Sequence, residues 1–280
     1  MQISGWKYYN HAAVPTCAPH EDPNTRVIET GEIWSLSDEL LPNKHPMMVW
    51  WTTDFDCSQE TPYWYVIKEG PFSLDELSKK YRHNVKVALD RCEVKWVNAI
   101  ECEDELWEVY EAAYTKYEGA QNKQSRDDFH KSLLDRDYEW CVAYSRENGN
   151  AIGWMKCLDK GECVETQIAK YHPGYLSLRA SDAIHYHVLN RYLNELGRKY
   201  VTSGTRNLNH KTHVQDYKIH NWHFRQAYCR LHLMYSPKVA WIIWLLYPIR
   251  KCLILLDSIK KVHAINGLLL MEEVSRKCKH

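Results

Sequence analysis

The most regular alternation of apolar and polar positions lies between Ser73 and Trp96. Ser73 and Glu76 have the spacing of a capping box, in which the two side chains satisfy free backbone N–H groups at a helix start. Apolar residues then return every three or four positions, which predicts a helix with one buried face. These residues are Leu74, Leu77, Tyr81, Val85 and Ala88. A strand over Glu93–Val97 is predicted to follow.

The rest of the central region alternates between strand-like and helix-like patterns. Helices are predicted over about 104–117, 125–134, 181–196 and 210–220, and strands over 140–144, 151–156, 163–169, 200–203 and 224–234. The turn Asn148-Gly149-Asn150 between two of these strands indicates a hairpin. The pattern predicts an α+β (mixed α/β) fold, with a central, mostly antiparallel mixed sheet flanked by helices.

The first 70 residues have a different character. Prolines and polar turns predict an irregular arm over residues 1–45, with one short strand at Arg26–Glu29. Aromatic and β-branched residues at 47–53 and 63–67 predict two strands, expected to form a hairpin that extends the main sheet. The expected organisation is an arm and hairpin over 1–70, a central domain over 71–237, and C-terminal amphipathic helices over 238–280.

The C-terminal region carries an apolar stripe at helical spacing, interrupted by a kink at Pro248. Its members are Trp241, Leu245, Ile249, Leu253, Leu256 and Ile259. Because cations flank the stripe, one interpretation is peripheral contact of residues 239–262 with an anionic membrane surface. The other is packing against the domain or against a second subunit in a homodimer.

Charge and cysteine content narrow the setting. The 36 Lys and Arg residues equal the 36 Asp and Glu residues, so no overall charge attracts nucleic acid. Cysteines are scattered without C-x-x-C spacing and the first residues lack the apolar run of a secretion signal, so a cytoplasmic protein is expected, with the inner membrane face as the alternative. His210, His213, His220 and His223 share a stripe without acidic or cysteine partners, so no metal is expected.

Two segments resemble a known family. The stretch LSKKYRHNVKVAL…EVKWV is similar to the beginning of the acyltransferase domain of FemABX proteins, a branch of the GNAT superfamily. The segment from Gln215 to Tyr228 is similar to the family ending "fK…fGFr.ay". The resemblance covers about Pro71–Tyr235 and implies a GNAT-like fold over 71–237.

The resemblance also implies an activity. The expected enzyme is an N-acyltransferase that moves an acyl or aminoacyl group from acetyl-CoA, another acyl-CoA or aminoacyl-tRNA to an amine. An amino sugar or a lipid-linked cell-envelope precursor would be the acceptor. The cationic row Lys79, Arg82 and Lys86 would face tRNA or simply solvent. The alternative is a non-catalytic binding module that keeps the fold.

In GNAT-like folds two strands splay apart, and the next helix N-terminus receives the donor phosphates. The strand at 163–169 and the following segment occupy that place, which makes Gly174, Ser177, Arg179 and Ser181 the candidate cofactor-binding residues. A structural alternative is that Ser181 only caps the helix.

Candidate acceptor and catalytic residues complete the predicted site. The loop after the strand at 200–203 supplies the substrate-binding candidates Arg206, Asn207, Asn209 and His210, because ligands gather at strand carboxyl ends. Transfer to an amine needs a base for the ammonium proton. Glu165 is the first candidate by position and His172 the second, and Tyr228 could protonate the leaving group.

Overall fold

The computed structural model describes residues 1–37, 43–115, 123–208 and 214–278. The chain divides into two compact units. Unit 1 comprises Met1–Tyr65, Thr205–His213 and Gln226–His280, and unit 2 comprises Val66–Gly204 and Val214–Arg225. The unit boundaries therefore fall within β4, at the end of β9, at the start of α6 and at the start of β10.

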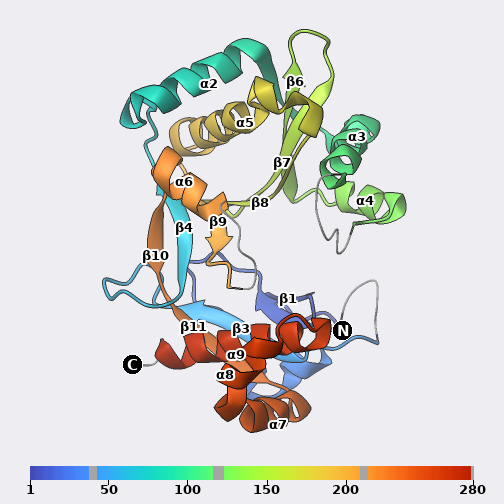
Figure 1. Cartoon of the computed structure of the whole chain (residues 1–280), viewed down its shortest axis with the longest axis vertical. Helices are drawn as coiled ribbons and strands as arrows, with labels where there is room; N and C mark the ends of the chain where they lie inside the picture. The colour runs from blue at the N-terminus through green and yellow to red at the C-terminus, as the bar shows by residue number, and fades with distance from the viewer. Residues whose placement is uncertain (38–42, 116–122, 209–213, 279–280) are drawn as a thin grey trace. The chain divides into compact units, whose positions relative to one another are not determined.

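A seven-stranded mixed sheet has the order β10-β4-β9-β8-β7-β6-β5 (Figure 1). The strands are β4 (Trp64–Glu69), β5 (Cys92–Val97), β6 (Tyr138–Ser145), β7 (Ala151–Asp159), β8 (Cys163–Tyr171), β9 (Tyr200–Thr205) and β10 (Arg225–Tyr228). Strands β5 to β8 form an antiparallel meander, and β8 pairs with β9 in parallel. The predicted hairpin around Asn148-Gly149-Asn150 is the β6–β7 pair.

Helices cover both faces of this meander in unit 2 (Figure 1). The unit contains α2 (Lys79–Arg91), α3 (Glu103–Tyr114), α4 (Arg126–Leu133) and α5 (Ala180–Leu189), with a π-helical turn at Asn190–Glu195 after α5, and α6 (Val214–Trp222) beside β9. Short 3-10 turns lie at Leu74–Glu76, Ala99–Cys102 and Pro173–Leu178.

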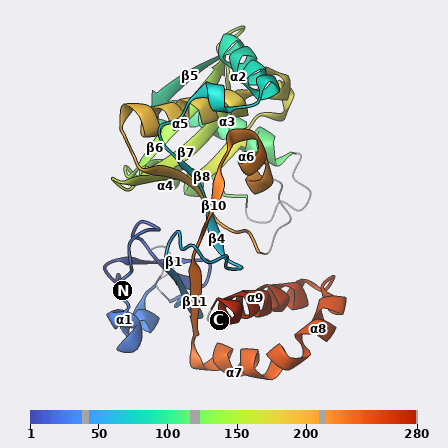
Figure 2. The ribbon, with the colours of Figure 1, turned by 90° about the vertical axis from the view of Figure 1, so that its left-hand side faces the viewer.

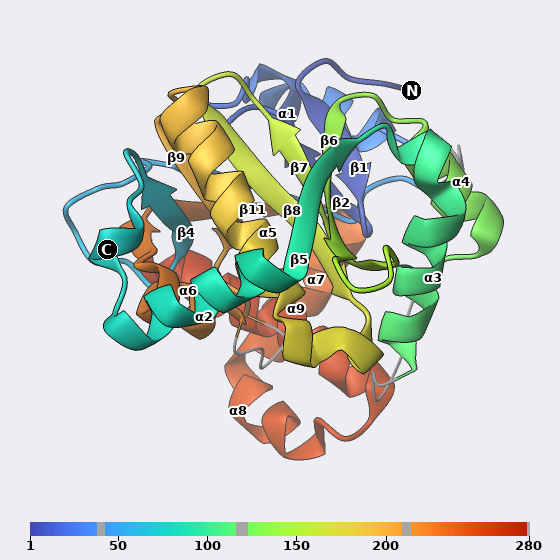
Figure 3. The same cartoon turned by 90° about the horizontal axis from the view of Figure 1, so that it is seen from above.

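Strand β6 shows why both faces need a cover. Trp140 and Val142 belong to an aromatic core cluster that also holds residues of α3 and α4, including Phe129. The alternate residues Cys141 and Ala143 are equally buried and leave the strand on the opposite face, which α5 covers. Seen from above, α5 crosses the strands with α2 beside it (Figure 3).

Unit 1 has its own four-stranded sheet, in the order β1-β2-β3-β11. The strands are β1 (Trp6–Tyr9), β2 (Ala12–Pro15), β3 (Met48–Thr53) and β11 (Arg230–Tyr235). The helical elements are α1 (Arg26–Glu29), α7 (Pro237–Leu246), α8 (Arg250–Leu253), α9 (Lys260–Lys277) and 3-10 turns at Glu32–Ser35, Tyr247–Ile249 and Ile254–Leu256. The chain leaves β11, runs along α7, turns through α8 and returns along α9 (Figure 2).

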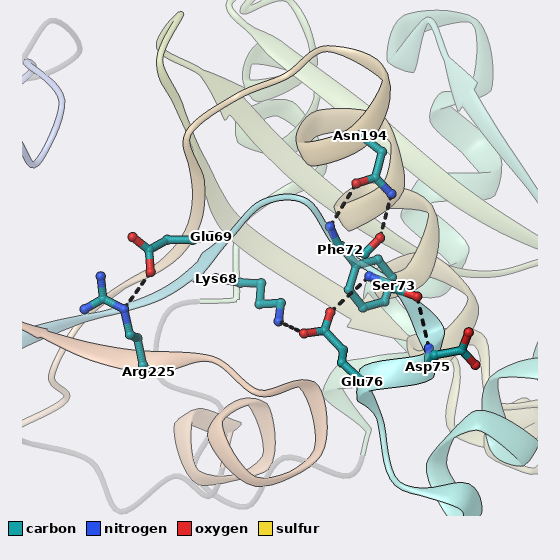
Figure 4. A network of polar contacts seen from close by, with 8 residues as sticks. All are labelled: Lys68, Glu69, Phe72, Ser73, Asp75, Glu76, Asn194 and Arg225. Atoms are coloured by element: carbon teal, nitrogen blue, oxygen red, sulfur yellow. Dashed lines mark hydrogen bonds and ion pairs between the residues drawn. The ribbon is translucent and has the colours of Figure 1, made fainter.

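The capping box at Ser73 and Glu76 forms as predicted, but it begins a 3-10 turn at Leu74–Glu76. Leu77 then has an extended backbone, and α2 starts at Lys79 with Ser78 as its N-cap. The Glu76 carboxylate accepts a hydrogen bond from the Ser73 backbone N–H at 3.1 Å and pairs with the Lys68 ammonium at 2.6 Å (Figure 4).

A second set of contacts fixes this turn against the π-helical turn. The Asn194 side chain accepts a hydrogen bond from the Phe72 backbone N–H at 2.9 Å and donates one to the Phe72 carbonyl at 2.8 Å (Figure 4). The turn is therefore held in place by a residue 122 positions further along the chain.

Four further sequence predictions differ from the structure. The strands at 47–53 and 63–67 exist as β3 and β4, but they lie in different sheets and form no hairpin. Residues Arg26–Glu29 form the helical turn α1 instead of a strand, and the supposedly irregular arm contains β1 and β2. The strand predicted over 224–234 divides at Cys229 into β10 and β11, one in each sheet.

Gly153 permits the close pairing of β7 with β8. A Cβ at this position would lie 2.7 Å from Cδ1 of Tyr171 and 3.3 Å from the Lys170 carbonyl oxygen. We therefore expect Gly153→Ala to lower the free energy of unfolding by about 1–3 kcal/mol through overpacking, as measured by urea denaturation. In a Tyr171→Ala background the same substitution should cost much less, and an equal cost would show that the ring is not the obstacle.

Candidate functional site

The parallel strands β8 and β9 pair over only three residue pairs and then part. The last pair in register is Glu165 with Thr202. Beyond this pair, the Thr202 carbonyl accepts a hydrogen bond from the Thr166 hydroxyl at 3.0 Å instead of continuing the backbone ladder. Gly204 adopts a φ of +81°, which redirects β9. The splay that a GNAT-like fold requires is therefore present in unit 2.

Lys218 of α6 enters this splay (Figure 1 shows α6 beside β9). Its ammonium donates to the Ser203 hydroxyl at 2.9 Å and to the Thr166 hydroxyl at 3.3 Å, so it bridges the two diverging strands. The residue is only 4% exposed. No Asp or Glu carboxylate of the described residues lies within ion-pair distance of the Lys218 ammonium. A buried lysine held by two neutral hydroxyls is energetically costly and typical of functional sites.

Burial changes the acid–base properties of this region. Desolvation lowers the pKa of Lys218 to about 8, opposed in part by the nearby Cys157 thiol. Desolvation also lowers the pKa of His185 to about 3, with the Lys218 charge acting in the same direction. His185 is therefore a neutral residue that stacks on Trp222, with ring centroids 5.5 Å apart. Lys218 is the titratable group of the splay whose charge changes near neutral pH.

The N-terminus of α5 lines a cavity of about 330 Å³ in unit 2. Its lining residues are Tyr81, Leu176, Ser177, Arg179, Ser181, Asp182 and Tyr217. Three of the four residues predicted to bind the donor are among them; Gly174 is not, although it belongs to the preceding 3-10 turn. The structure thus brings Ser177, Arg179 and Ser181 together around a hollow at a helix N-terminus.

Arg179 is held in place by its neighbours in this cavity. Its guanidinium donates to the buried Asp182 carboxylate at 3.1 Å, and the Tyr217 hydroxyl donates to the other Asp182 oxygen at 2.6 Å. Its backbone adopts a left-handed conformation with φ of +62°. This conformation costs a non-glycine residue about 1 kcal/mol or more. Because its side chain stays 40% exposed, Arg179 could still contact an anionic ligand.

The two predicted base candidates both lie in unit 2, with different surroundings. Glu165 accepts from Lys160 at 2.8 Å and from the Gln167 amide at 2.6 Å. Successive strand residues point to opposite faces, so Glu165 leaves β8 on the face opposite to Thr166 and Lys218. His172 caps the 3-10 turn, where Nδ1 accepts the Gly174 backbone N–H at 3.1 Å.

The remaining predicted residues belong to unit 1. Arg206 donates to the Pro62 carbonyl at 2.7 Å and its guanidinium lies 4.4 Å from the centre of the Trp64 ring. Asn207 is exposed. The Tyr228 hydroxyl donates to the Gln226 side chain at 3.0 Å. Asn209 and His210 lie outside the described residues.

Unit 1 has a cavity of its own next to this loop. It measures about 280 Å³ and is lined by Leu208 together with residues of α8 and α9. Its polar groups interact with one another. Arg250 forms an ion pair with Glu273 at 3.2 Å, and the Asp257 carboxylate accepts a hydrogen bond from the Asn266 side-chain amide at 2.8 Å. These pairs reduce the polarity of the wall, which otherwise consists mainly of leucine and isoleucine side chains.

Sequence reasoning missed Lys218, the most distinctive group of the splay. The helix that carries it shows no strong apolar face, so its lysine resembles an ordinary surface residue. A sequence signal for this lysine was present in the family ending "fK…fGFr.ay", in which "fK" corresponds to Tyr217 and Lys218. Within the part of the chain that the structure describes, no group of three or more His, Cys, Asp and Glu side chains is placed to hold a metal ion.

Comparison with known proteins supports the fold. No family model and no curated protein matches the chain. The C-terminal domain of a putative lysylphosphatidylglycerol synthetase from Agrobacterium fabrum is similar, with a TM-score of 0.53 at 10% sequence identity. That match covers 86% of this chain and 82% of the other.

Two further solved structures resemble the chain less closely. L-PGS from Bacillus licheniformis gives a TM-score of 0.49 at 10% identity, with 86% of this chain and 83% of that chain covered. FemX gives 0.47 at 9% identity, with 72% and 74% covered. The predicted α+β fold is confirmed, and the Agrobacterium domain shares it.

The charge of Lys218 leads to a pH-dependent prediction for stability. The pKa of Lys218 is lowered from 10.5 to about 8 in the folded protein. Below pH 8 the buried charge therefore lowers the free energy of unfolding, and this destabilisation is lost as pH rises from 8 to 10.5. We expect Lys218→Met to raise the free energy of unfolding by about 3 kcal/mol more at pH 7 than at pH 10.5. Urea denaturation at both pH values measures this difference.

The matched control is Lys86→Met, because Lys86 is exposed on α2. Its effect on unfolding should be nearly the same at the two pH values. If Lys218→Met also showed no pH dependence, its ammonium would have an ordinary pKa and the proposed desolvation would be absent.

Proposed function

We propose that the protein is an acyltransferase that moves an acyl or aminoacyl group from an activated donor to an amine acceptor. The observation that carries the proposal is the buried Lys218 ammonium between the diverging strands β8 and β9. The cavity at the N-terminus of α5 supports it, because it lies in the same unit and combines a helix N-terminus with a guanidinium.

The α5 cavity would hold the anionic part of the donor. Free backbone N–H groups and the helix dipole favour phosphate at a helix N-terminus. Arg179 would add a two-pronged donor, and Ser177 and Ser181 would add hydroxyls. Both acyl-CoA and aminoacyl-tRNA present phosphates, so this chemistry accommodates either donor. A free amino sugar or a lipid-linked precursor remains our proposal for the acceptor.

Lys218 would act on the charge that develops during transfer. When the acceptor amine adds to the acyl carbonyl, the carbonyl oxygen becomes an oxyanion, which a preorganised donor stabilises. A pKa of about 8 leaves Lys218 mainly protonated at neutral pH, as this role requires. Thr166 and Ser203 would fix the direction of the ammonium and leave its third N–H for the substrate.

Of the two candidate bases for the acceptor's ammonium proton, Glu165 keeps more free lone pairs, but it leaves β8 on the face opposite to Lys218, so proton transfer to it from an amine beside Lys218 would need a relay. His172 accepts a backbone N–H at Nδ1, so its neutral ring carries the proton on Nε2 and has no free basic nitrogen. The Glu165 carboxylate has further lone pairs beyond its bonds to Lys160 and Gln167. Tyr228 belongs to unit 1, so its role as proton donor to the leaving group stays an expectation from the sequence.

Turnover should depend on Lys218 through its charge. We expect Lys218→Met to lower kcat roughly 100- to 1000-fold, the usual effect of losing an oxyanion donor, while the variant stays folded. Wild-type kcat should fall as pH rises through about 8, where the ammonium loses its proton. Glu165→Gln should also lower kcat but leave this high-pH decline in place. A kcat that increases through pH 8 would instead assign Lys218 the role of base.

Arg179 should control donor binding. We expect Arg179→Gln to weaken donor binding about tenfold or more, as measured by thermal-shift titration with coenzyme A and with aminoacyl-tRNA in parallel. Arg146, an exposed arginine elsewhere in unit 2, provides the matched control as Arg146→Gln. A wild-type melting temperature that neither compound shifts would favour a binding module that has kept the fold without the activity.

A further inference from the structure

The segment after β11 in unit 1 has two apolar faces, and only one of them is buried. Val239 and Ile243 of α7 pack against Leu269 of α9, and each is at most 5% exposed. The other face of α7 projects Trp241, Trp244 and Leu245 into solvent, with exposed fractions of 71%, 68% and 63%. Such a face on a folded unit indicates a surface for another molecule.

The exposed face continues past the kink at Pro248. Ile249, Ile254, Leu255 and Leu256 are all exposed, and Leu255 reaches 84%. The chain runs outward along α7 and returns along α9 (Figure 2). These exposed apolar residues lie on α7 and on the 3-10 turns before and after α8, while α9 supplies the inner packing. We call residues 237–256 the apolar flap.

We propose that the apolar flap inserts into the surface of a lipid bilayer that contains anionic lipids. Between residues 237 and 263 the chain has five lysines and arginines against one aspartate, Asp257. These cations attract anionic headgroups, and each Lys or Arg near the surface strengthens binding about fivefold. Tryptophan favours the headgroup region of a bilayer, because its ring is apolar and its N–H can donate hydrogen bonds to headgroups and water.

The internal contacts of the flap favour lying in the membrane surface over crossing the bilayer. Among the described residues, Pro237–Leu256 is long and apolar enough to span, with a mean hydropathy of 1.8. However, Arg250 is bonded to Glu273 of α9, and the Leu253 carbonyl receives the Asn266 amide at 3.1 Å. Spanning would break these contacts and bury Arg250, whereas insertion of the exposed face alone keeps them.

The charges also argue against a second copy of this chain as the occupant. In a symmetric dimer the same patch occurs on both subunits, so the cations around the flap would face one another. A bilayer supplies the opposite charge. The inference concerns unit 1 alone and does not depend on the proposed transfer reaction.

Co-sedimentation of the full chain with vesicles tests the proposal. We expect binding to vesicles of phosphatidylcholine with one third phosphatidylglycerol, and much weaker binding to phosphatidylcholine alone. Trp244→Glu should lower the partition coefficient at least tenfold. Tyr9→Glu provides the matched control, because Tyr9 is an aromatic residue of unit 1 with 65% exposure, and it should have no effect.

Charge removal separates headgroup attraction from apolar insertion. Lys238→Gln combined with Lys251→Gln should lower binding to the anionic vesicles roughly thirtyfold, the equivalent of two lysine contacts. Lys80→Gln with Lys86→Gln, two exposed positions on α2, should leave it unchanged. Cys252 is the only exposed cysteine of the ten, so an environment-sensitive dye there should report a less polar surrounding on binding.

Three outcomes would overturn the proposal. The first is a wild-type chain that binds neither kind of vesicle. The second is a dimer in sedimentation velocity that Trp244→Glu converts to monomer without any vesicle binding, which would make the flap a subunit interface. The third is bound protein that does not transfer to added empty vesicles, which would indicate a spanning segment.

Discussion

The early end of the β8–β9 pairing is the constraint on which the candidate site depends. Parallel strands that stayed paired would fill this position with backbone hydrogen bonds and leave no room for a side chain from α6. The strands part because the Thr166 hydroxyl donates a hydrogen bond to the Thr202 carbonyl and Gly204 redirects β9. Lys218 then supplies donors to hydroxyls on both strands. The unusual pKa of this lysine follows from the same geometry that opens the sheet.

Local patterns predicted local structure well. The β6–β7 hairpin, the Ser125 cap of α4 and the kink at Pro248 all depend on residues within a few positions of one another. Strand partners depend on distant residues, and there the predictions were wrong. The runs at 47–53 and 63–67 have strand composition, but nothing in them specifies that β3 pairs with β11 while β4 lies between β10 and β9.

The candidate site shows the same division between local and distant information. Family resemblance located Ser177, Arg179 and Ser181, which the structure gathers around one cavity. It did not single out Lys218, because a lysine on a weakly amphipathic helix looks solvent-exposed until its helix is packed into the sheet. Burial, and with it the altered pKa, is a property of the assembled unit. The roles of Glu165, His172, Tyr228 and the Arg206 loop stay predictions.

The contact between Phe72 and Asn194 has a consequence for how unit 2 folds. The turn before α2 is anchored by a side chain that is synthesised 122 residues later, and β4 finds its partner β9 only after a similar interval. Contacts of such long sequence separation slow folding, because the entropy of closing the loop is lost before the contact forms. While the chain is being synthesised, the apolar side of β4 therefore has no native partner, and its protection during that interval would fall to chaperones or to transient non-native contacts.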